Sequence, residues 1–146
     1  MNGNYNIKGL AHICVYSRDF RKSINFYTTI LGFTKVYNTT LIKDDASILQ
    51  YALLKIGTCL IKLLAPDDHS CIPDGQSVVE HFALEVQGLD ALYITLIVKG
   101  VRFKTEIFHL PKSFNRGCKG FFIYGPGQEL IELFEYISET PFYDAP

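Results

Sequence analysis

The chain has 146 residues, of which 48% are hydrophobic, and a formal net charge of −1 at pH 7. This length suffices for one well-buried domain. No apolar run reaches the roughly 18–20 residues of a membrane span. No basic stripe indicates a nucleic-acid partner, and the polar N-terminus shows no signal peptide. We therefore expect a cytoplasmic globular protein with no membrane partner.

The four cysteines show no close metal-ligand spacing such as C-x-x-C; they are Cys14, Cys59, Cys71 and Cys118. A chain without a secretion signal is expected to keep its thiols reduced. We therefore expect free thiols, with Cys14, Cys59 and Cys118 in strands.

The first half of the chain predicts a βαβββ unit. Residues 11–16 alternate as a strand does, so His12, Cys14 and Tyr16 share one face. A helix follows, capped by Ser17 or Asp19. Its apolar stripe is Phe20, Ile24, Tyr27 and Leu31, and Gly32 closes it. Three further strands are predicted at residues 33–41, 48–55 and 59–64, and Pro66 ends the last of them.

The second half repeats this order after a linker rich in turn formers at residues 67–77. A strand is predicted at 79–86, a helix with the stripe Leu89, Leu92, Tyr93 and Leu96, and Gly100 as its end. Further strands are predicted at 101–108, 121–124 and 130–137, with a loop at 109–117. Gly125-Pro126-Gly127-Gln128 predicts a type II turn.

Three pairs of landmarks recur at a nearly constant offset. His12 and His81 are 69 residues apart, Gly32 and Gly100 are 68 apart, and Lys62 and Glu132 are 70 apart. Such a period indicates two copies of one supersecondary unit. We predict an α+β fold: two tandem βαβββ modules forming a curved mixed sheet around a central cleft. The single domain would comprise module 8–66, linker 67–77, module 78–137 and an irregular tail, 138–146.

Each half presents polar side chains on the sheet face that its helix leaves uncovered. His12, His81 and Glu132 form a 2-His-1-carboxylate set, which suits Zn, Ni, Mn or Fe(II). Three ligands leave coordination positions open for substrate oxygens. A lone histidine on a strand is more often a structural residue than a ligand. The matched placement of both histidines in the repeat is what favours a metal site here.

Lys62 occupies the fourth matched position and leaves two interpretations open. Its ammonium group cannot ligate a metal at neutral pH and would repel a divalent ion. In one interpretation Lys62 and Glu132 form an ion pair without a metal. In the other, three ligands bind the metal while Lys62 turns aside, acts on the substrate or loses its proton. Lys112, Arg116 and Lys119 could also hold an anionic substrate.

Three segments resemble the vicinal oxygen chelate superfamily, which includes glyoxalase I, bleomycin- and fosfomycin-resistance proteins and extradiol dioxygenases. They are His12-Ile-Cys-Val-Tyr-Ser-Arg-Asp19, Ser23-Ile-Asn-Phe-Tyr-Thr-Thr-Ile-Leu-Gly-Phe33 and Tyr124-Gly-Pro-Gly-Gln-Glu-Leu-Ile-Glu132-Leu. The resemblance runs from about residue 8 to 137. It implies paired modules around a U-shaped metal cleft. The usual four ligand positions of the glyoxalase-like branch fall on His12, Lys62, His81 and Glu132, where Glu or Gln is usual in place of Lys62.

The resemblance implies a homodimeric glyoxalase-like lyase or isomerase that acts on a small oxygen-rich molecule. A divalent metal would chelate two neighbouring substrate oxygens, and Glu132 would move the proton as the catalytic residue. One alternative is a metal-free ligand-binding protein of the bleomycin-resistance type. Another is an Fe(II) extradiol-type dioxygenase, since that branch uses only His, His and Glu. Whether the modules pair within one chain or across a dimer stays open.

Overall fold

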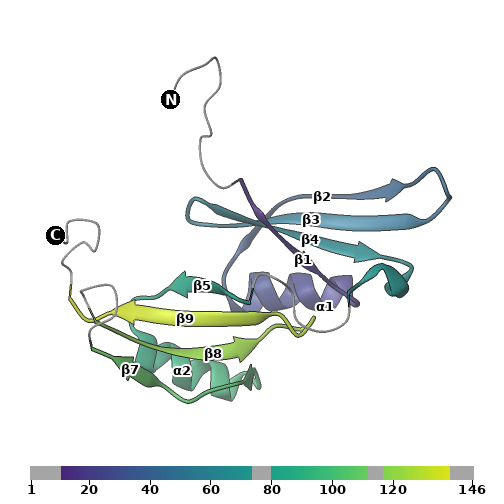
Figure 1. Ribbon diagram of the computed structural model, residues 1–146. Helices are drawn as coiled ribbons and strands as arrows, with labels where there is room; N and C mark the ends of the chain where they lie inside the picture. The colour runs from purple at the N-terminus through teal and green to yellow at the C-terminus, as the bar shows by residue number, and fades with distance from the viewer. Residues whose placement is uncertain (1–10, 74–79, 112–116, 139–146) are drawn as a thin grey trace, which may run out of the picture. The chain divides into compact units, whose positions relative to one another are not determined.

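Two compact units make up the protein, Met1–Ile72 and Pro73–Pro146. The computed structural model describes residues 11–73, 80–111 and 117–138 (Figure 1). Each unit contains one mixed sheet and one α-helix. The predicted α+β class is therefore confirmed.

The first unit has the predicted βαβββ order. Its sheet is arranged β1-β4-β3-β2, with β1 parallel to β4 and the other neighbours antiparallel. Its elements are β1 (Ile13–Tyr16), α1 (Phe20–Asn25), the π-helical segment η1 (Phe26–Ile30), β2 (Thr34–Ile42), β3 (Ile48–Ile56), β4 (Cys59–Pro66) and the 3₁₀ turn η2 (His69–Cys71).

Asp19 begins α1, because its carboxylate accepts a hydrogen bond from the Lys22 N–H at 3.0 Å. The helix then widens into η1, where the Leu31 N–H donates to the Phe26 carbonyl at 3.1 Å. This wider turn brings both Phe26 and Tyr27 into the core, whereas the regular spacing predicted only Tyr27 there. Gly32 ends the segment in the left-handed conformation, at φ 81°.

The sheet of the first unit has one buried face and one uncovered face. The buried face carries Val15, Ala52, Leu54, Ile61 and Leu63, all at most 8% exposed, and α1 contacts β4. The opposite face is called here the free face of the first unit. It carries Cys14, Tyr16, Tyr37, Thr39, Tyr51, Leu53, Leu60, Lys62 and Leu64. The predicted alternation along β1 and β4 is therefore confirmed.

The second unit repeats the topology with the order β5-β9-β8-β6, and β7 also pairs with β8. Strand β5 is parallel to β9, as β1 is to β4. The elements are β5 (Phe82–Glu85), α2 (Leu89–Val98), β6 (Arg102–Phe103), β7 (Phe108–Leu110), β8 (Cys118–Tyr124) and β9 (Leu130–Tyr136). Figure 1 shows α2 against one face of this sheet. The core there comprises Leu89, Leu96, Phe121, Ile123, Ile131 and Leu133.

The prediction of one continuous strand at residues 101–108 was wrong. Phe103 pairs with Ile123 and Phe108 pairs with Gly120, so five steps along one strand oppose three along the other. Between these pairs, the Phe122 N–H donates to the Thr105 hydroxyl at 2.9 Å instead of to a backbone carbonyl. The Thr105 hydroxyl thus replaces a backbone carbonyl as the acceptor between the strands, and the predicted strand is divided into β6 and β7.

The turn before β9 also differs from its prediction. A type II turn would require a positive φ at Gly127. The left-handed residue is instead Gln128, at φ 71°. The Gln128 N–H donates to the Gly125 carbonyl at 3.0 Å, and the Gly127 N–H donates to Glu129 Oε1 at 2.7 Å. The carboxylate of Glu129, the residue after the turn, therefore stabilises this conformation.

The N-terminus of α2 is capped by a residue distant in sequence. Gly88 at the cap position has no side chain to accept a hydrogen bond. The Gly88 N–H donates instead to Glu135 Oε2 on β9, at 2.6 Å. Lys119 lies 3.7 Å from the same carboxylate and 3.0 Å from Asp90. Helix and sheet are thus joined by charged groups on the covered face, where the sequence suggested only apolar contacts.

All four cysteines are free thiols, as predicted, and Cys14, Cys59 and Cys118 lie in β1, β4 and β8. Cys118 is buried and the other three are exposed. None of the helices in the described part of the chain is long and apolar enough to cross a membrane.

Candidate functional site

The two predicted pairs of site residues occupy equivalent positions in their units. Each histidine lies one residue before the first strand of its unit, and the residue two positions later pairs with the polar residue of the last strand. Cys14 pairs with Lys62 in the first unit, and Ala83 pairs with Glu132 in the second. The register of the parallel strands thus reproduces the repeat that the sequence predicted.

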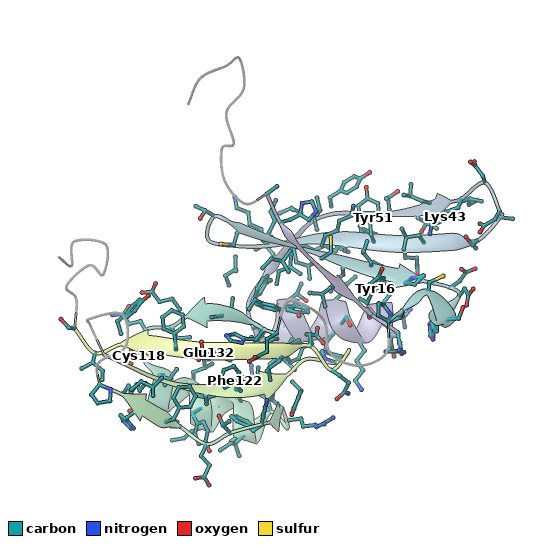
Figure 2. The ribbon with its side chains drawn as sticks, viewed as in Figure 1. Tyr16, Lys43, Tyr51, Cys118, Phe122 and Glu132 are labelled. Atoms are coloured by element: carbon teal, nitrogen blue, oxygen red, sulfur yellow. The ribbon has the colours of Figure 1, made fainter. Side chains whose placement is uncertain are left out.

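In the second unit, His81 and Glu132 lie together on the face opposite α2. Their Nε2 and Oε1 atoms are 3.8 Å apart, and the side chains are 31% and 21% exposed. This distance is too long for a hydrogen bond. Phe122, which pairs with Glu132 across β8 and β9 (Figure 2), presents its ring edge-on to His81 at 5.1 Å between centroids. An imidazole and a carboxylate therefore share a partly desolvated position.

Burial raises the pKa of the Glu132 carboxyl, and the nearby His81 acts in the opposite direction as the smaller effect. The apolar surroundings disfavour the charged carboxylate more than the imidazole stabilises it. Glu132 is therefore closer to holding a proton at neutral pH than an exposed glutamate would be. A carboxyl with this property is suited to proton transfer.

Glu80 contacts the other nitrogen of the His81 ring, with Oε1 3.2 Å from Nδ1. A proton on Nδ1 that donates to this carboxylate leaves the lone pair of Nε2 available on the side of Glu132. Glu80 and Phe122 were not predicted as site residues. The alternation of β8 could have indicated Phe122, whereas Glu80 simply adjoins His81 in the sequence.

The spacing of His81 and Glu132 allows both side chains to bind one divalent metal. Two ligands that each lie about 2.0–2.2 Å from zinc can be at most about 4.4 Å apart. The 3.8 Å between His81 Nε2 and Glu132 Oε1 is within that reach. Within either unit, the described residues hold no group of three His, Cys, Asp or Glu side chains placed to bind one ion. A third protein ligand would thus have to be added to this pair.

In the first unit, His12 is exposed immediately before β1, and Lys62 on β4 lies on the free face. The Lys62 ammonium lies over the ring of Tyr51, with Nζ 4.5 Å from the ring centroid. Figure 2 shows Tyr51 on β3 of this unit. The position that corresponds to Glu132 therefore carries a cation held by an aromatic ring, a partner that the sequence did not suggest.

The basic residues in and beside the loop before β8 divide into two groups. Lys119 pairs with Asp90 and Glu135 on the helix-covered side of its sheet, and these carboxylates raise the pKa of its ammonium. The suggestion that Lys119 holds a substrate was therefore wrong, because its charge is already used to join α2 to β8. Lys112 and Arg116 lie outside the described residues.

Several solved structures share this fold. A glyoxalase family protein from Bacillus cereus aligns with a TM-score of 0.75 at 14% identity, over 94% of this chain and 100% of that one. The fosfomycin resistance protein FosX from Listeria monocytogenes, complexed with Mn(II) and sulfate, aligns at 0.65 and 20% identity, over 89% and 93%. The trypanothione-dependent glyoxalase I of Leishmania major aligns at 0.69 and 18% identity, over 88% and 87%.

The comparison with curated proteins found no match. In contrast, the family model of the glyoxalase, bleomycin resistance protein and dioxygenase superfamily matches residues 9–133. This range includes His12, Lys62, His81 and Glu132. The chain therefore belongs to the glyoxalase/bleomycin resistance protein/dioxygenase superfamily.

Proposed function

We propose that the protein is a glyoxalase-like lyase or isomerase that acts on a small oxygen-rich substrate with a divalent metal. The proposed ligands are His12, His81 and Glu132. The observation that carries the proposal is the 3.8 Å spacing of His81 Nε2 and Glu132 Oε1 on the uncovered face. The equivalent position of His12 in the first unit supports its assignment as the third ligand.

A divalent ion bound there would act as a Lewis acid and stabilise negative charge that develops on two neighbouring substrate oxygens. Glu132 would take a proton from the substrate carbon beside those oxygens and return it to the adjacent carbon. The raised pKa of Glu132 suits this exchange, because a carboxyl that neither holds nor releases its proton too strongly transfers it fastest. Glu80 would keep Nε2 of His81 unprotonated.

Lys62 supports a second candidate, a metal-free protein that binds its ligand without converting it. A positive charge at the fourth position opposes a divalent ion and instead attracts an anion. This candidate differs from the first in metal content, and both differ from a dioxygenase in the need for oxygen.

Metal titration separates these functions. Zn²⁺ or Mn²⁺ would be titrated calorimetrically into chelator-treated parent protein, into His81→Ala and into His109→Ala, an exposed histidine of the same unit. We expect the parent and His109→Ala to bind alike, and His81→Ala to lose at least about tenfold in affinity. A parent without measurable binding would favour the metal-free candidate.

Catalysis is tested by proton exchange. The metal-loaded protein would be incubated with hydroxyacetone in D₂O, and loss of the proton signal beside the carbonyl followed by NMR. The parent should accelerate exchange and Glu132→Gln should not, since the amide cannot accept the proton. Oxygen consumption with catechol, in place of exchange, would assign the chain to the dioxygenases.

A further inference from the structure

We infer that Lys62 and Tyr51 form an anion-binding subsite on the free face of the first unit, so that the substrate is a small organic anion. The inference deepens the proposed function and rests on it: the anion would be the part of the substrate that is not at the reacting carbon. Its chemical class is an oxyanion, a carboxylate or a phosphate.

No described residue of the first unit neutralises the charge of Lys62. The side chain is half-buried, and among the described residues of the first unit no carboxylate forms an ion pair with it. The contact that holds it is the Tyr51 ring, at 4.5 Å from Nζ. An aromatic face attracts a cation but does not accept three N–H hydrogen bonds as oxygen atoms do. The ammonium therefore keeps donors available for an oxyanion.

The surroundings of Lys62 also favour an anion. Across the strands its partners are Cys14 on β1 and Leu53 on β3, and beside these lie Tyr16, Tyr37 and Tyr51. No Asp or Glu occupies a free-face position in the four strands of this sheet, which all lie in the described part of the chain. An anion there would meet positive charge and hydroxyl groups, and these four strands would present no competing carboxylate.

The two tyrosines add neutral donors beside the cation. The rings of Tyr37 and Tyr51 lie 5.9 Å apart between centroids. Burial raises the pKa of Tyr51, and Tyr37 raises it further through its own charge and a hydrogen bond between the side chains. Tyr51 thus keeps its proton at neutral pH, and its hydroxyl can donate to an oxyanion. Lys62 would supply the positive charge, and the tyrosine hydroxyls would orient the anion by hydrogen bonds.

An anion-binding role for Lys62 would explain why the first unit has a lysine at the position where the second unit has Glu132. Lys62 and Glu132 are register-equivalent, and each is presented on the uncovered face of its own sheet. The substrate would then carry a carboxylate or a phosphate, which Lys62 would bind. Neutral analogues of the same shape would be poor substrates.

The test uses chelator-treated full-length protein, so that no metal contributes to anion binding. Inorganic phosphate and, separately, acetate would be titrated while the backbone amide NMR signals of residues 49–53 and 60–64 are followed. The variants are Lys62→Gln, Lys62→Arg and Lys55→Gln. Lys55 is an exposed lysine at the end of β3, on the same face as Lys62.

We expect Lys62→Gln to weaken binding of the preferred anion at least about tenfold, because a charge-assisted contact is lost. Lys62→Arg and Lys55→Gln should remain within about twofold of the parent, since each keeps a charge at position 62. Whichever of phosphate and acetate binds more tightly identifies the class of anion. A dispersed amide spectrum confirms that each variant is folded.

Equal binding by Lys62→Gln and Lys55→Gln, or a parent that binds neither anion, would overturn the subsite. Metal titration of the same Lys62→Gln sample separates this outcome from failure of the proposed function. Loss of the anion site with metal binding intact is the expected result. If the parent binds the anion but neither the parent nor any variant binds metal, the metal-dependent function is wrong and the subsite stands.

Discussion

Lys62 is the residue at which this chain departs most from a four-ligand metal site. A positive charge about 4 Å from another costs about 4 kcal/mol at an effective dielectric of 20, and more beside a divalent ion. The Tyr51 ring holds the Lys62 ammonium at 4.5 Å, which gives the side chain a stable position without a carboxylate. We therefore expect Lys62 to lower the affinity for a divalent metal and to raise the affinity for an anion.

Lys62→Glu should raise metal affinity by about two orders of magnitude or more, since it removes the repulsion and adds a usual ligand. The measurement is calorimetric titration of Zn²⁺ into parent and variant after chelator treatment. Lys55→Glu serves as the control, because it adds the same charge at the exposed end of β3. If Lys62→Glu binds no more tightly than Lys55→Glu, position 62 does not govern metal binding.

Glu132→Gln should stabilise the metal-free protein at neutral pH but not at acidic pH. Burial raises the pKa of Glu132 in the folded state above its unfolded value. Its contribution to stability is therefore complete below the unfolded pKa and is lost as the pH rises through the folded pKa. Glutamine never ionises and avoids this loss. Melting temperatures in chelator, measured from about pH 4 to pH 8, check the prediction.

The matched control is Glu85→Gln, at an exposed position on the same face of the second unit. Its melting curve should keep the pH dependence of the parent. A Glu132→Gln variant that is less stable than the parent at pH 8 would show that the ionised carboxylate is favoured by its surroundings, contrary to the burial argument.

At the scale of elements, α2 depends on a cap supplied by β9. The Gly88 N–H has a carboxylate partner, Glu135, 47 residues away, and the same carboxylate lies near Lys119. Glu135→Ala should lower the free energy of unfolding by about 1–2 kcal/mol, the usual cost of a lost cap. Urea denaturation of this variant and of Glu106→Ala, an exposed glutamate, provides the comparison. Equal midpoints for the two variants would contradict the capping role.

The elements that the sequence predicted well are those that depend on local periodicity. Alternation alone placed Ile61 and Leu63 in the core and Lys62 outside, because side chains in a strand alternate whatever the strand pairs with. The repeat offset also brought His81 and Glu132 together, since His81 directly precedes β5 and Glu132 lies in β9, the parallel neighbour of β5.

The features that the sequence did not predict depend on partners far along the chain. The break between β6 and β7 arises where the Thr105 hydroxyl replaces a carbonyl opposite Phe122, and no local pattern marks that exchange. The cap from Glu135 and the ring beneath Lys62 likewise require strands to be paired first. The turn was predicted to have its left-handed residue at Gly127 but has it at Gln128, where the Glu129 carboxylate accepts a hydrogen bond from the Gly127 N–H.

At the scale of the whole molecule, the chain is two versions of one unit with different charges at the matched position. The first unit contains His12 and the cation Lys62, and the second unit contains His81 and the carboxylate of Glu132. Neither unit alone holds three candidate ligands among its described residues. The proposed metal function requires His12 as the third ligand beside His81 and Glu132.

The metal content of His12→Ala tests this requirement most directly. Parent, His12→Ala and His69→Ala would be purified without chelator and their metal per chain measured by elemental analysis; His69 is an exposed histidine of the same unit. We predict about one ion per chain in the parent and in His69→Ala, and about a tenth of that or less in His12→Ala, which keeps its fold. Equal metal content in His12→Ala and His69→Ala, or a parent without metal, would contradict the proposal.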